Sequence, residues 1–428
     1  MFKKKLILFL VAAFSMTQIY FVGFIGISEL VMLACGPFML WRYYSDLKRD
    51  GFLPLITLAG LWVLSAIATD VYRETAFNDA LKGVAPPVLI LFMTPCLYVL
   101  LRDDLKAFKW GLIGFVVTLF LSTYIIQAGT SVSRAEMQGI SARQAALEYK
   151  NTFMMFFVQP IRLFPSFYYL QAPVLSTVIT LGLALFSLYE GGRGVFLSLT
   201  ISAGILFLAG GRSAGIIRMP RKIILLVFMV LLLSYSAKQT YEYMVKNNYL
   251  GAAELNKYEM QVESKIGLLS GRSQFVSFFY AVFDSPILGH GSWVLDWSGY
   301  NVRAMEWLEE YENIKIYNTQ GKVDYLNAHS HIMTAYLWHG VLGAVFWFYV
   351  LILLWRTIII YVRATPEFFG YLALTVPGVT WAIMFSPLTT RVSTTFLLVV
   401  CLLVRRQYIA ARNGQIIKAK PTRKISAL

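Results

Sequence analysis

Long, mostly apolar runs recur along the whole chain, and they limit its fold more than any other feature. A helix needs about 20 apolar residues to cross the hydrocarbon core of a bilayer, with a range of about 17–25. The runs predict an all-α, polytopic membrane protein with about 12 transmembrane helices. The predicted spans are 6–22, 28–41, 52–69, 83–101, 110–128, 152–170, 174–190, 194–210, 223–237, 335–355, 368–386 and 393–404.

Composition agrees with this class and excludes several others. The 428 residues are 57% hydrophobic and 14% charged, whereas soluble proteins average about 45–50% apolar and about 25% charged residues. A soluble enzyme and a disordered scaffold are therefore excluded. The three cysteines, Cys35, Cys96 and Cys401, stand singly in apolar runs and form neither a disulfide framework nor a metal-type spacing.

The net charge of +15 is explained by orientation in a membrane. If the N-terminus is cytoplasmic, the predicted inner segments carry a net charge of +17 and the rest of the chain carries −2. Such an excess of Lys and Arg is typical of cytoplasmic loops. Both termini are therefore predicted to be cytoplasmic, membrane lipids are the expected contact of the basic tail, and no basic stripe remains for a nucleic acid.

This topology divides the chain into four parts. Residues 1–237 hold spans one to nine, 238–334 form a large outer loop, 335–404 hold spans ten to twelve, and 405–428 form a basic cytoplasmic tail. The large loop is predicted to contain an amphipathic helix over 239–265 and an apolar-aromatic helix over 273–283.

Two arginines are predicted to bind an anion at the outer face. Arg193 follows Gly191 and Gly192 between spans seven and eight, where glycine lets the backbone approach a ligand closely. Arg272 follows a Ser-Gly pair at the start of helix 273–283, and both a guanidinium and a helix N-terminus attract phosphate. A plain surface role for either arginine stays open at this point.

Two further arginines are weaker candidates for anion binding. Arg391 lies in a short outer loop before span twelve. Arg162 is a charge inside predicted span six, and charges within a membrane usually face a cavity or a partner. Arg212 follows a similar Gly-Gly pair on the inner side, where we interpret it as an orientation charge.

Histidines stand directly before span ten. His329 at the outer end of a helix can act as a general base, because the unperturbed pKa of histidine is near 6.5. A structural capping role is the alternative for this histidine. The His-x-His spacing to His331 also allows a metal site, with His290 or Asp324 as a third ligand. We expect a structural turn around His290, with a lesser chance that it faces a cavity, and we expect His339 to pack between helices.

Three stretches resemble, in order, the bacterial O-antigen ligase and polymerase superfamily of polytopic glycosyltransferases. They are EGGRGVFLSL, SGRSQFVSFFYAVFDSPILGHG and AHSHIMTAYLWHGVLGAVFW, within about 190–350. In the last, His329, Gly340 and Gly343 match the family's His-Asn opening and later Gly-x-x-Gly. Ser330 stands where the family commonly has Asn, and glycine replaces a common serine in the turn before Arg193.

The resemblance implies a C-type glycosyltransferase architecture in the bacterial cytoplasmic (inner) membrane, with the active site facing the periplasm. The donor would be a glycan on undecaprenyl diphosphate and the acceptor a sugar hydroxyl. Transfer would invert the anomeric centre without a metal, cofactor or nucleotide sugar. Arg193 and Arg272 would then stabilise the diphosphate leaving group and His329 would take the acceptor proton, with Arg391, Arg162, His290 and His331 as further candidate contacts.

The motifs leave three functions open. A polysaccharide polymerase is favoured over an O-antigen ligase acting on lipid A-core or protein, because loop 293–328 and HSHIMTAY differ from typical ligases. A chain-length regulator is then a possible protein partner. A lipid-linked glycan flippase is the third candidate, but a transporter would place charges through the middle of its spans, and only Arg162 lies there.

Overall fold

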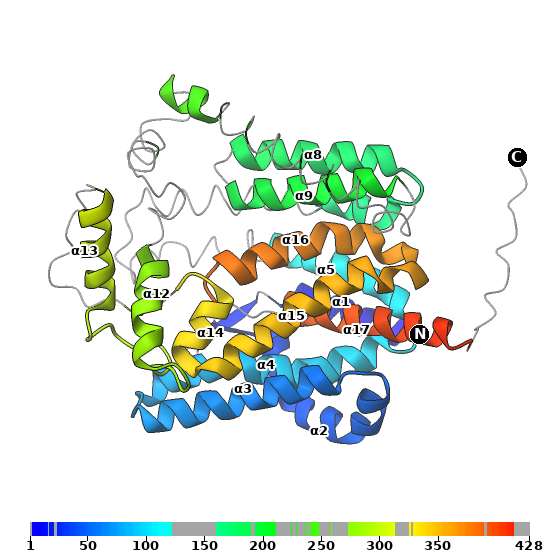
Figure 1. Cartoon of the computed structure of the whole chain (residues 1–428). Helices are drawn as coiled ribbons and strands as arrows, with labels where there is room; N and C mark the ends of the chain where they lie inside the picture. The colour runs from blue at the N-terminus through cyan, green and yellow to red at the C-terminus, as the bar shows by residue number, and fades with distance from the viewer. Residues whose placement is uncertain are drawn as a thin grey trace, which may run out of the picture.

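The computed structural model describes residues 2–15, 17–20, 24–121, 160–189, 193–210, 241–247, 273–312, 325–326, 328–388 and 392–414, with single residues at 224, 228, 235, 239 and 258. This part of the chain is almost entirely helical, as predicted (Figure 1). The α-helices are α1 (Phe2–Ala13), α2 (Ile27–Arg49), α3 (Leu53–Tyr72), α4 (Phe77–Leu101), α5 (Phe108–Leu121), α8 (Pro173–Tyr189), α9 (Arg193–Ala209), α12 (Ser273–Asp284), α13 (Tyr300–Glu312), α14 (His331–His339), α15 (Val341–Ile359), α16 (Phe369–Phe385) and α17 (Val392–Arg412). Short 3-10 turns, Leu105–Ala107, Tyr361–Ala364 and Pro366–Phe368, precede α5 and α16, and β1 (Gln18–Tyr20) pairs with β2 (Phe24–Gly26).

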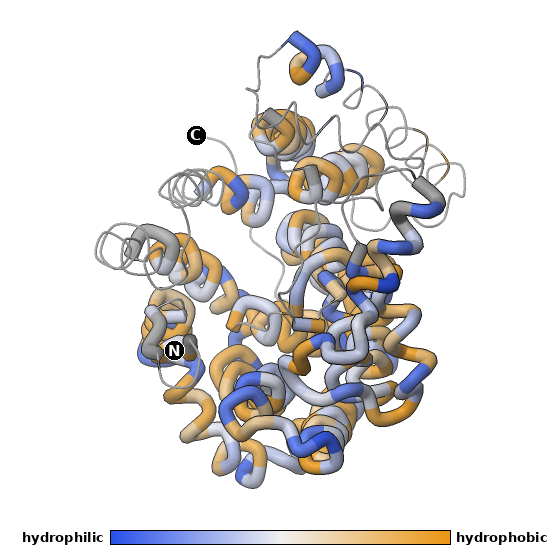
Figure 2. Tube along the Cα trace, turned by 90° about the vertical axis from the view of Figure 1, so that its left-hand side faces the viewer, coloured by the Kyte–Doolittle hydropathy of each residue, from blue (hydrophilic) through white to orange (hydrophobic). Residues whose placement is uncertain are grey.

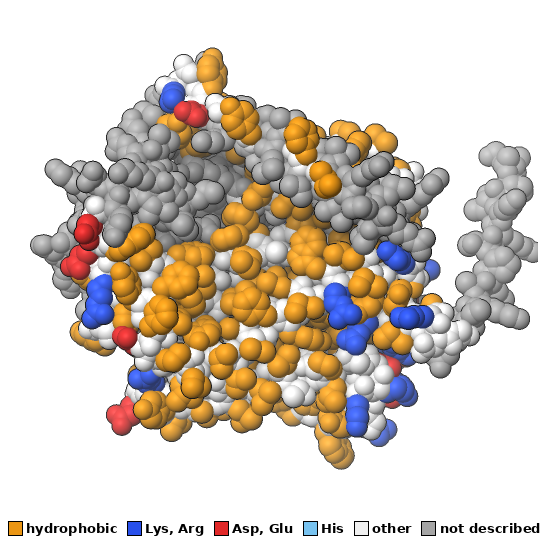
Figure 3. All heavy atoms as spheres, in the orientation of Figure 1, with side chains coloured by type: hydrophobic (Ala, Val, Ile, Leu, Met, Phe, Trp, Pro, Cys, Tyr) orange, Lys and Arg blue, Asp and Glu red, His pale blue; other side chains and the backbone are white. Residues whose placement is uncertain are grey.

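Five helices are long and apolar enough to cross a membrane. They are Leu53–Tyr72, Phe77–Leu101, Val341–Ile359, Pro366–Phe385 and Val392–Arg412, and two shorter apolar helices lie at Pro173–Leu188 and Gly194–Ala209. Hydrophobic side chains cover much of the visible surface along these helices (Figure 3). Soluble monomers rarely expose apolar patches of more than a few hundred Å². The chain is therefore a helical protein whose surface suits a membrane.

The prediction of a first span over 6–22 is wrong. Helix α1 ends at Ala13, where the Ser15 hydroxyl donates to the Ala12 carbonyl at 2.7 Å. The antiparallel hairpin β1–β2 follows, with Ile19 opposite Ile25. Aromatic and β-branched residues favour strands, and an apolar run alone does not distinguish a buried strand from a helix.

Span ten, predicted over 335–355, is two helices. Helix α14 stops at His339 and α15 starts at Val341, because Gly340 adopts φ 77° and its backbone lies against the Ile287 carbonyl. A Cβ atom at Gly340 would overlap that carbonyl oxygen. The loop before α13 thus breaks the span.

Other predicted boundaries shift as well. Helix α2 continues through Pro37 to Arg49, beyond the predicted end at 41, and α17 continues to Arg412, well into the predicted tail. Helix α13 lies within loop 293–328, where no helix is predicted from the sequence. The described residues leave out 122–128 of span 110–128, 152–159 of span 152–170, most of span 223–237 and of helix 239–265, and the tail beyond 414.

The long helices run roughly side by side in Figure 1 and are seen nearly end-on in Figure 2. The pair α8–α9 packs on α16, α16 packs on α15, and α15 packs on α3 and α17. Aromatic side chains fill the centre of these layers, among them Trp62, Trp347, Phe108 and Phe396.

The two ends of this bundle differ in charge. Ion pairs join the start of α1 to the end of α4 (Lys4–Asp103, 2.5 Å) and join α17 to the end of α2 (Arg406–Asp50, 2.9 Å). Lys and Arg side chains gather at this end, on the right of Figure 3, which we call the basic end. Helices α12, α13 and α14 lie at the opposite end, which we call the loop end (Figure 1).

Candidate functional site at the loop end of α16

The last turns of α16 contact two helices that begin at or beside predicted site arginines. Gly194, the second residue of α9, packs so closely on the Trp381 indole that a Cβ atom would overlap it. Arg193 is the first residue of α9, so its backbone lies beside this part of α16. Phe275, in the first turn of α12, lies 6.3 Å from Phe385 between ring centroids. The structure thus brings α9 and α12 together at one end of α16.

Ser330 connects the start of α14 to the same end of α16. Its hydroxyl accepts the Met333 amide hydrogen at 3.3 Å, as an N-cap, and donates to the Ile383 carbonyl at 3.0 Å. Asn and Ser are equally good N-caps. The serine that departs from the resembling family therefore keeps the capping role that an asparagine would have.

His329 directly precedes this cap and is half-buried. Its backbone has φ 43°, in the left-handed region that few residues other than glycine adopt. Such a conformation costs on the order of 1–3 kcal/mol and persists only where the surroundings impose it. Ser330 on one side and buried Ala328 on the other hold the residue there.

His331 points into the protein. Its side chain is only 3% exposed, its ring lies 4.7 Å from the Trp347 ring, and it hydrogen-bonds the Pro387 carbonyl. The two histidines of the His-x-His motif therefore differ in environment: His329 is half-buried before the helix cap, and His331 is buried in the core. Within the described residues, no group of three or more His, Cys, Asp or Glu is placed to hold a metal ion, and Asp324 lies outside them.

His339 packs between helices, as predicted. Its ring is fully buried, accepts the Trp62 indole hydrogen at Nδ1 (2.9 Å) and contacts the Ser292 hydroxyl at Nε2 (2.9 Å). Because Nδ1 accepts, Nε2 carries the hydrogen and donates to Ser292. The Ser292 hydroxyl in turn donates to the buried Asp70 carboxylate at 2.7 Å, and the Ser292 amide donates to the same carboxylate at 2.7 Å.

This network was not predicted from the sequence. Trp62 and Asp70 both come from α3, so Ser292 and His339 fasten the loop before α13 and the end of α14 to that helix. Asp70 offered the only hint, as an acid at the end of an apolar run. We call Trp62, Asp70, Ser292 and His339 the anchor network.

His290 lies in the same loop, where its side chain contacts the backbone of α12. Its Nε2 donates to the Ala281 carbonyl at 2.7 Å. Burial lowers the pKa of His290, although this hydrogen bond acts in the opposite direction, and the nearby Arg73 lowers the pKa further. Arg73 itself holds the loop through the Ser285 hydroxyl (2.6 Å) and the Gly289 carbonyl (3.1 Å).

Of the remaining predicted arginines, only Arg162 has a described side chain. Arg272 and Arg391, and the side chain of Arg193, lie outside the described residues. Arg162 is described, and it lines a cavity deeper along α16, where its guanidinium donates to the Leu374 carbonyl at 3.1 Å.

Comparison with known proteins does not assign the chain to a family. No protein-family model matches it, and the search of curated proteins gives no match.

Proposed function

We propose that this protein is an inverting, metal-independent glycosyltransferase. It would transfer a glycan from undecaprenyl diphosphate to a sugar hydroxyl at the outer face of the bacterial cytoplasmic membrane, and act as a polysaccharide polymerase. The proposal rests on the motif resemblance, and one structural observation carries it further. Segments from three distant parts of the sequence, each bearing or adjoining a predicted site residue, contact the last turns of α16.

That convergence supports a single site for the expected chemistry. The acceptor oxygen attacks the anomeric carbon, the bond from that carbon to the diphosphate oxygen breaks, and the diphosphate leaves with the electron pair. Arg193 and Arg272 would stabilise the growing negative charge, because arginine is permanently charged and binds phosphate with two parallel hydrogen bonds. Arg391, four residues after Pro387, is a further candidate for this role.

His329 would take the proton from the acceptor hydroxyl. It stands at the start of α14 on the same end of α16, and the positive end of a helix disfavours a charged imidazolium. A neutral ring can accept a proton, and general base catalysis contributes typically about 10²–10⁴-fold in rate. His331 does not share this position, because its ring is buried against Trp347.

The charge difference between the two ends supports the proposed orientation. The basic end would face the cytoplasm, as Lys and Arg do in most membrane proteins. The loop end, with the candidate site, would then face the periplasm.

A lipid-linked glycan transporter is the second candidate. Arg162 favours it, because this charge lines a cavity beside Leu374, near the middle of an apolar helix. A transporter would move the lipid-linked glycan without changing it chemically, so the two functions differ in their products.

Purified protein in liposomes that contain a polyprenyl-diphosphate-linked repeat unit tests the proposal. We expect longer lipid-linked chains without added nucleotide sugar and at an unchanged rate with chelator. Transfer only to added lipid A-core would indicate the ligase instead. Movement of the glycan across the bilayer without new glycosidic bonds would contradict the proposal and favour the transporter, and a rate that fell with chelator and returned with zinc would contradict the metal-independent mechanism.

A further inference from the structure

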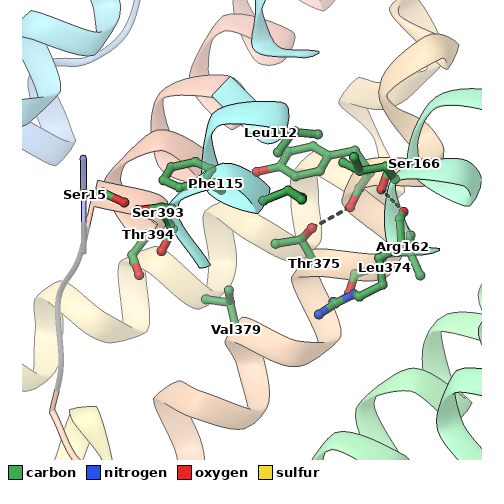
Figure 4. A pocket seen from close by; sticks show the side chains of 14 residues that line it. Ser15, Leu112, Phe115, Arg162, Ser166, Leu374, Thr375, Val379, Ser393 and Thr394 are labelled. Carbon is green, nitrogen blue, oxygen red and sulfur yellow. Dashed lines mark hydrogen bonds between the residues drawn. The ribbon is translucent and has the colours of Figure 1, made fainter. Parts of the chain in front are cut away.

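A cavity of about 250 Å³ lies among α5, α16, the start of α17 and the helix at 160–168 (Figure 4). Seven of its fourteen lining residues carry a hydroxyl group, six are apolar, one is Arg162, and none is acidic. By the same measure, about 10–15 Å³ is enough to hold one water molecule. The cavity therefore has room for a small polar group beside hydrocarbon.

Arg162 brings a positive charge into this cavity, and no carboxylate in the described part of the chain pairs with it. One of its five N–H groups donates to the Leu374 carbonyl, and Figure 4 shows the side chain reaching toward α16. No ion pair with Arg162 occurs among the described residues. Leu374 lies near the middle of the apolar helix Pro366–Phe385. A charge at such a depth is costly unless an anion or polar groups compensate it.

The first turn of α17 adds to the positive potential. Helix α17 begins at Val392, and Ser393 and Thr394 line the cavity. The first amide hydrogens of a helix lack partners within it, and this end of the helix dipole is positive. The guanidinium and the helix start therefore favour the same kind of ligand, an anion.

We propose that the Arg162 cavity binds the phosphate group of a membrane lipid. The guanidinium and hydroxyl groups suit the phosphate, and apolar residues such as Leu112, Phe115 and Val379 suit the adjoining hydrocarbon. Leu374 precedes Ile383, the partner of Ser330, by nine residues, or about 13 Å along a helix. The cavity is thus a second phosphate site, whose guanidinium is set back from the proposed reaction site while Ser393, on its far side, is two residues from Arg391. Lipid binding there would not depend on whether the protein transfers glycans.

Native mass spectrometry of the full chain in detergent tests this site by counting bound lipids. The probes are farnesyl diphosphate, short-chain phosphatidylglycerol and inorganic phosphate. Arg162→Gln removes the charge, and Val379→Phe fills the cavity while keeping the arginine, so the test does not depend on one variant folding. Arg303→Gln is the matched control, because Arg303 is exposed on α13 at the loop end.

We expect Arg162→Gln and Val379→Phe to bind one lipid fewer than the wild type, with affinity for that lipid weakened by about ten- to a hundredfold, as for loss of a hydrogen bond to a charged group. Arg303→Gln should bind as the wild type does. The probe that is lost identifies the source, a polyprenyl diphosphate or a phospholipid. Equal lipid counts in all four proteins would overturn the inference. So would inorganic phosphate binding as tightly as either lipid, because the hydrocarbon would then play no part.

These outcomes are distinguishable from those of the proposed function. A protein that transfers glycan but loses no lipid in Arg162→Gln contradicts the second site alone. A protein that loses the lipid but forms no glycosidic bond contradicts the glycosyltransferase proposal alone.

Discussion

Hydrogen-bond direction separates the roles of the histidines at the scale of single residues. His339 accepts from Trp62 and donates to Ser292, so both ring nitrogens are committed inside the core. Replacing it by Ala would leave the Trp62 N–H without its acceptor, and an unsatisfied buried donor costs about 1–3 kcal/mol. The anchor network therefore makes His339→Ala a test of stability rather than of catalysis.

The proposed role of Arg193 and Arg272 in binding the donor diphosphate gives a second prediction for single residues. Arg193→Lys and Arg272→Lys should each lower glycan transfer by about 10²–10³-fold, as is typical for losing one stabilising donor in a site of this kind. Lysine keeps the charge but cannot form two parallel hydrogen bonds with a phosphate. Initial rates with a purified lipid-linked donor measure the effect. Arg303→Lys is the control, and wild-type rates in Arg272→Lys would show that a point charge is sufficient.

At the scale of elements, the break between α14 and α15 determines how the start of α14 is positioned against α16. Because Gly340 has no side chain, the Ile287 carbonyl of the loop can pack against the backbone between the two helices. The loop is also hydrogen-bonded to the end of α14: the His290 amide donates to the Leu337 carbonyl, and the Gly291 amide donates to the Trp338 carbonyl. The loop and α14 therefore form one unit that is fastened to α3 by the anchor network. This unit holds the start of α14, with His329, against α16.

Two glycine variants test the importance of this break. Gly340→Ala should destabilise the protein strongly, because the residue has φ 77° and its Cβ atom would overlap the Ile287 carbonyl. Gly378→Ala, in α16, is the matched control, since nothing lies within 4 Å of a Cβ atom there. Alanine in a helix is favoured over glycine by roughly 0.5–1 kcal/mol. Thermal unfolding in detergent should show a lower midpoint for Gly340→Ala and an equal or higher one for Gly378→Ala; the reverse order would contradict this packing.

At the scale of the whole molecule, the positions of several long helices were predictable, because a helix that crosses a bilayer needs a run of about 20 apolar residues. Helices α3, α8, α9 and α16 begin and end within about three residues of the predicted spans. The β1–β2 hairpin was missed because its apolar residues suit a helix as well. The anchor network was missed because Asp70 and Ser292 stand 222 residues apart, and no local pattern shows that they meet. The site residues were proposed from motif order, and only the structure brings α9, α12 and α14 to one end of α16.

The orientation of the whole molecule gives a prediction that does not depend on activity. Ser298, beside α13, and Ser45, near the end of α2, are both exposed and lie at opposite ends of the bundle. In a protein that has Cys35 replaced by Ser, a membrane-impermeant thiol reagent added to intact cells with a permeable outer membrane should label Ser298→Cys but not Ser45→Cys. Labelling of Ser45→Cys alone would invert the topology and place the candidate site in the cytoplasm.

The most direct test of the central claim compares transfer and donor binding in His329→Ala. We expect transfer by the purified variant to fall by about 10²–10⁴-fold, the typical contribution of a general base, while donor affinity stays near that of the wild type because the arginines remain. His290→Gln, which can still donate to the Ala281 carbonyl, is the control and should transfer at nearly the wild-type rate. Transfer by His329→Ala at the wild-type rate, in protein that folds and binds the donor, would contradict the account.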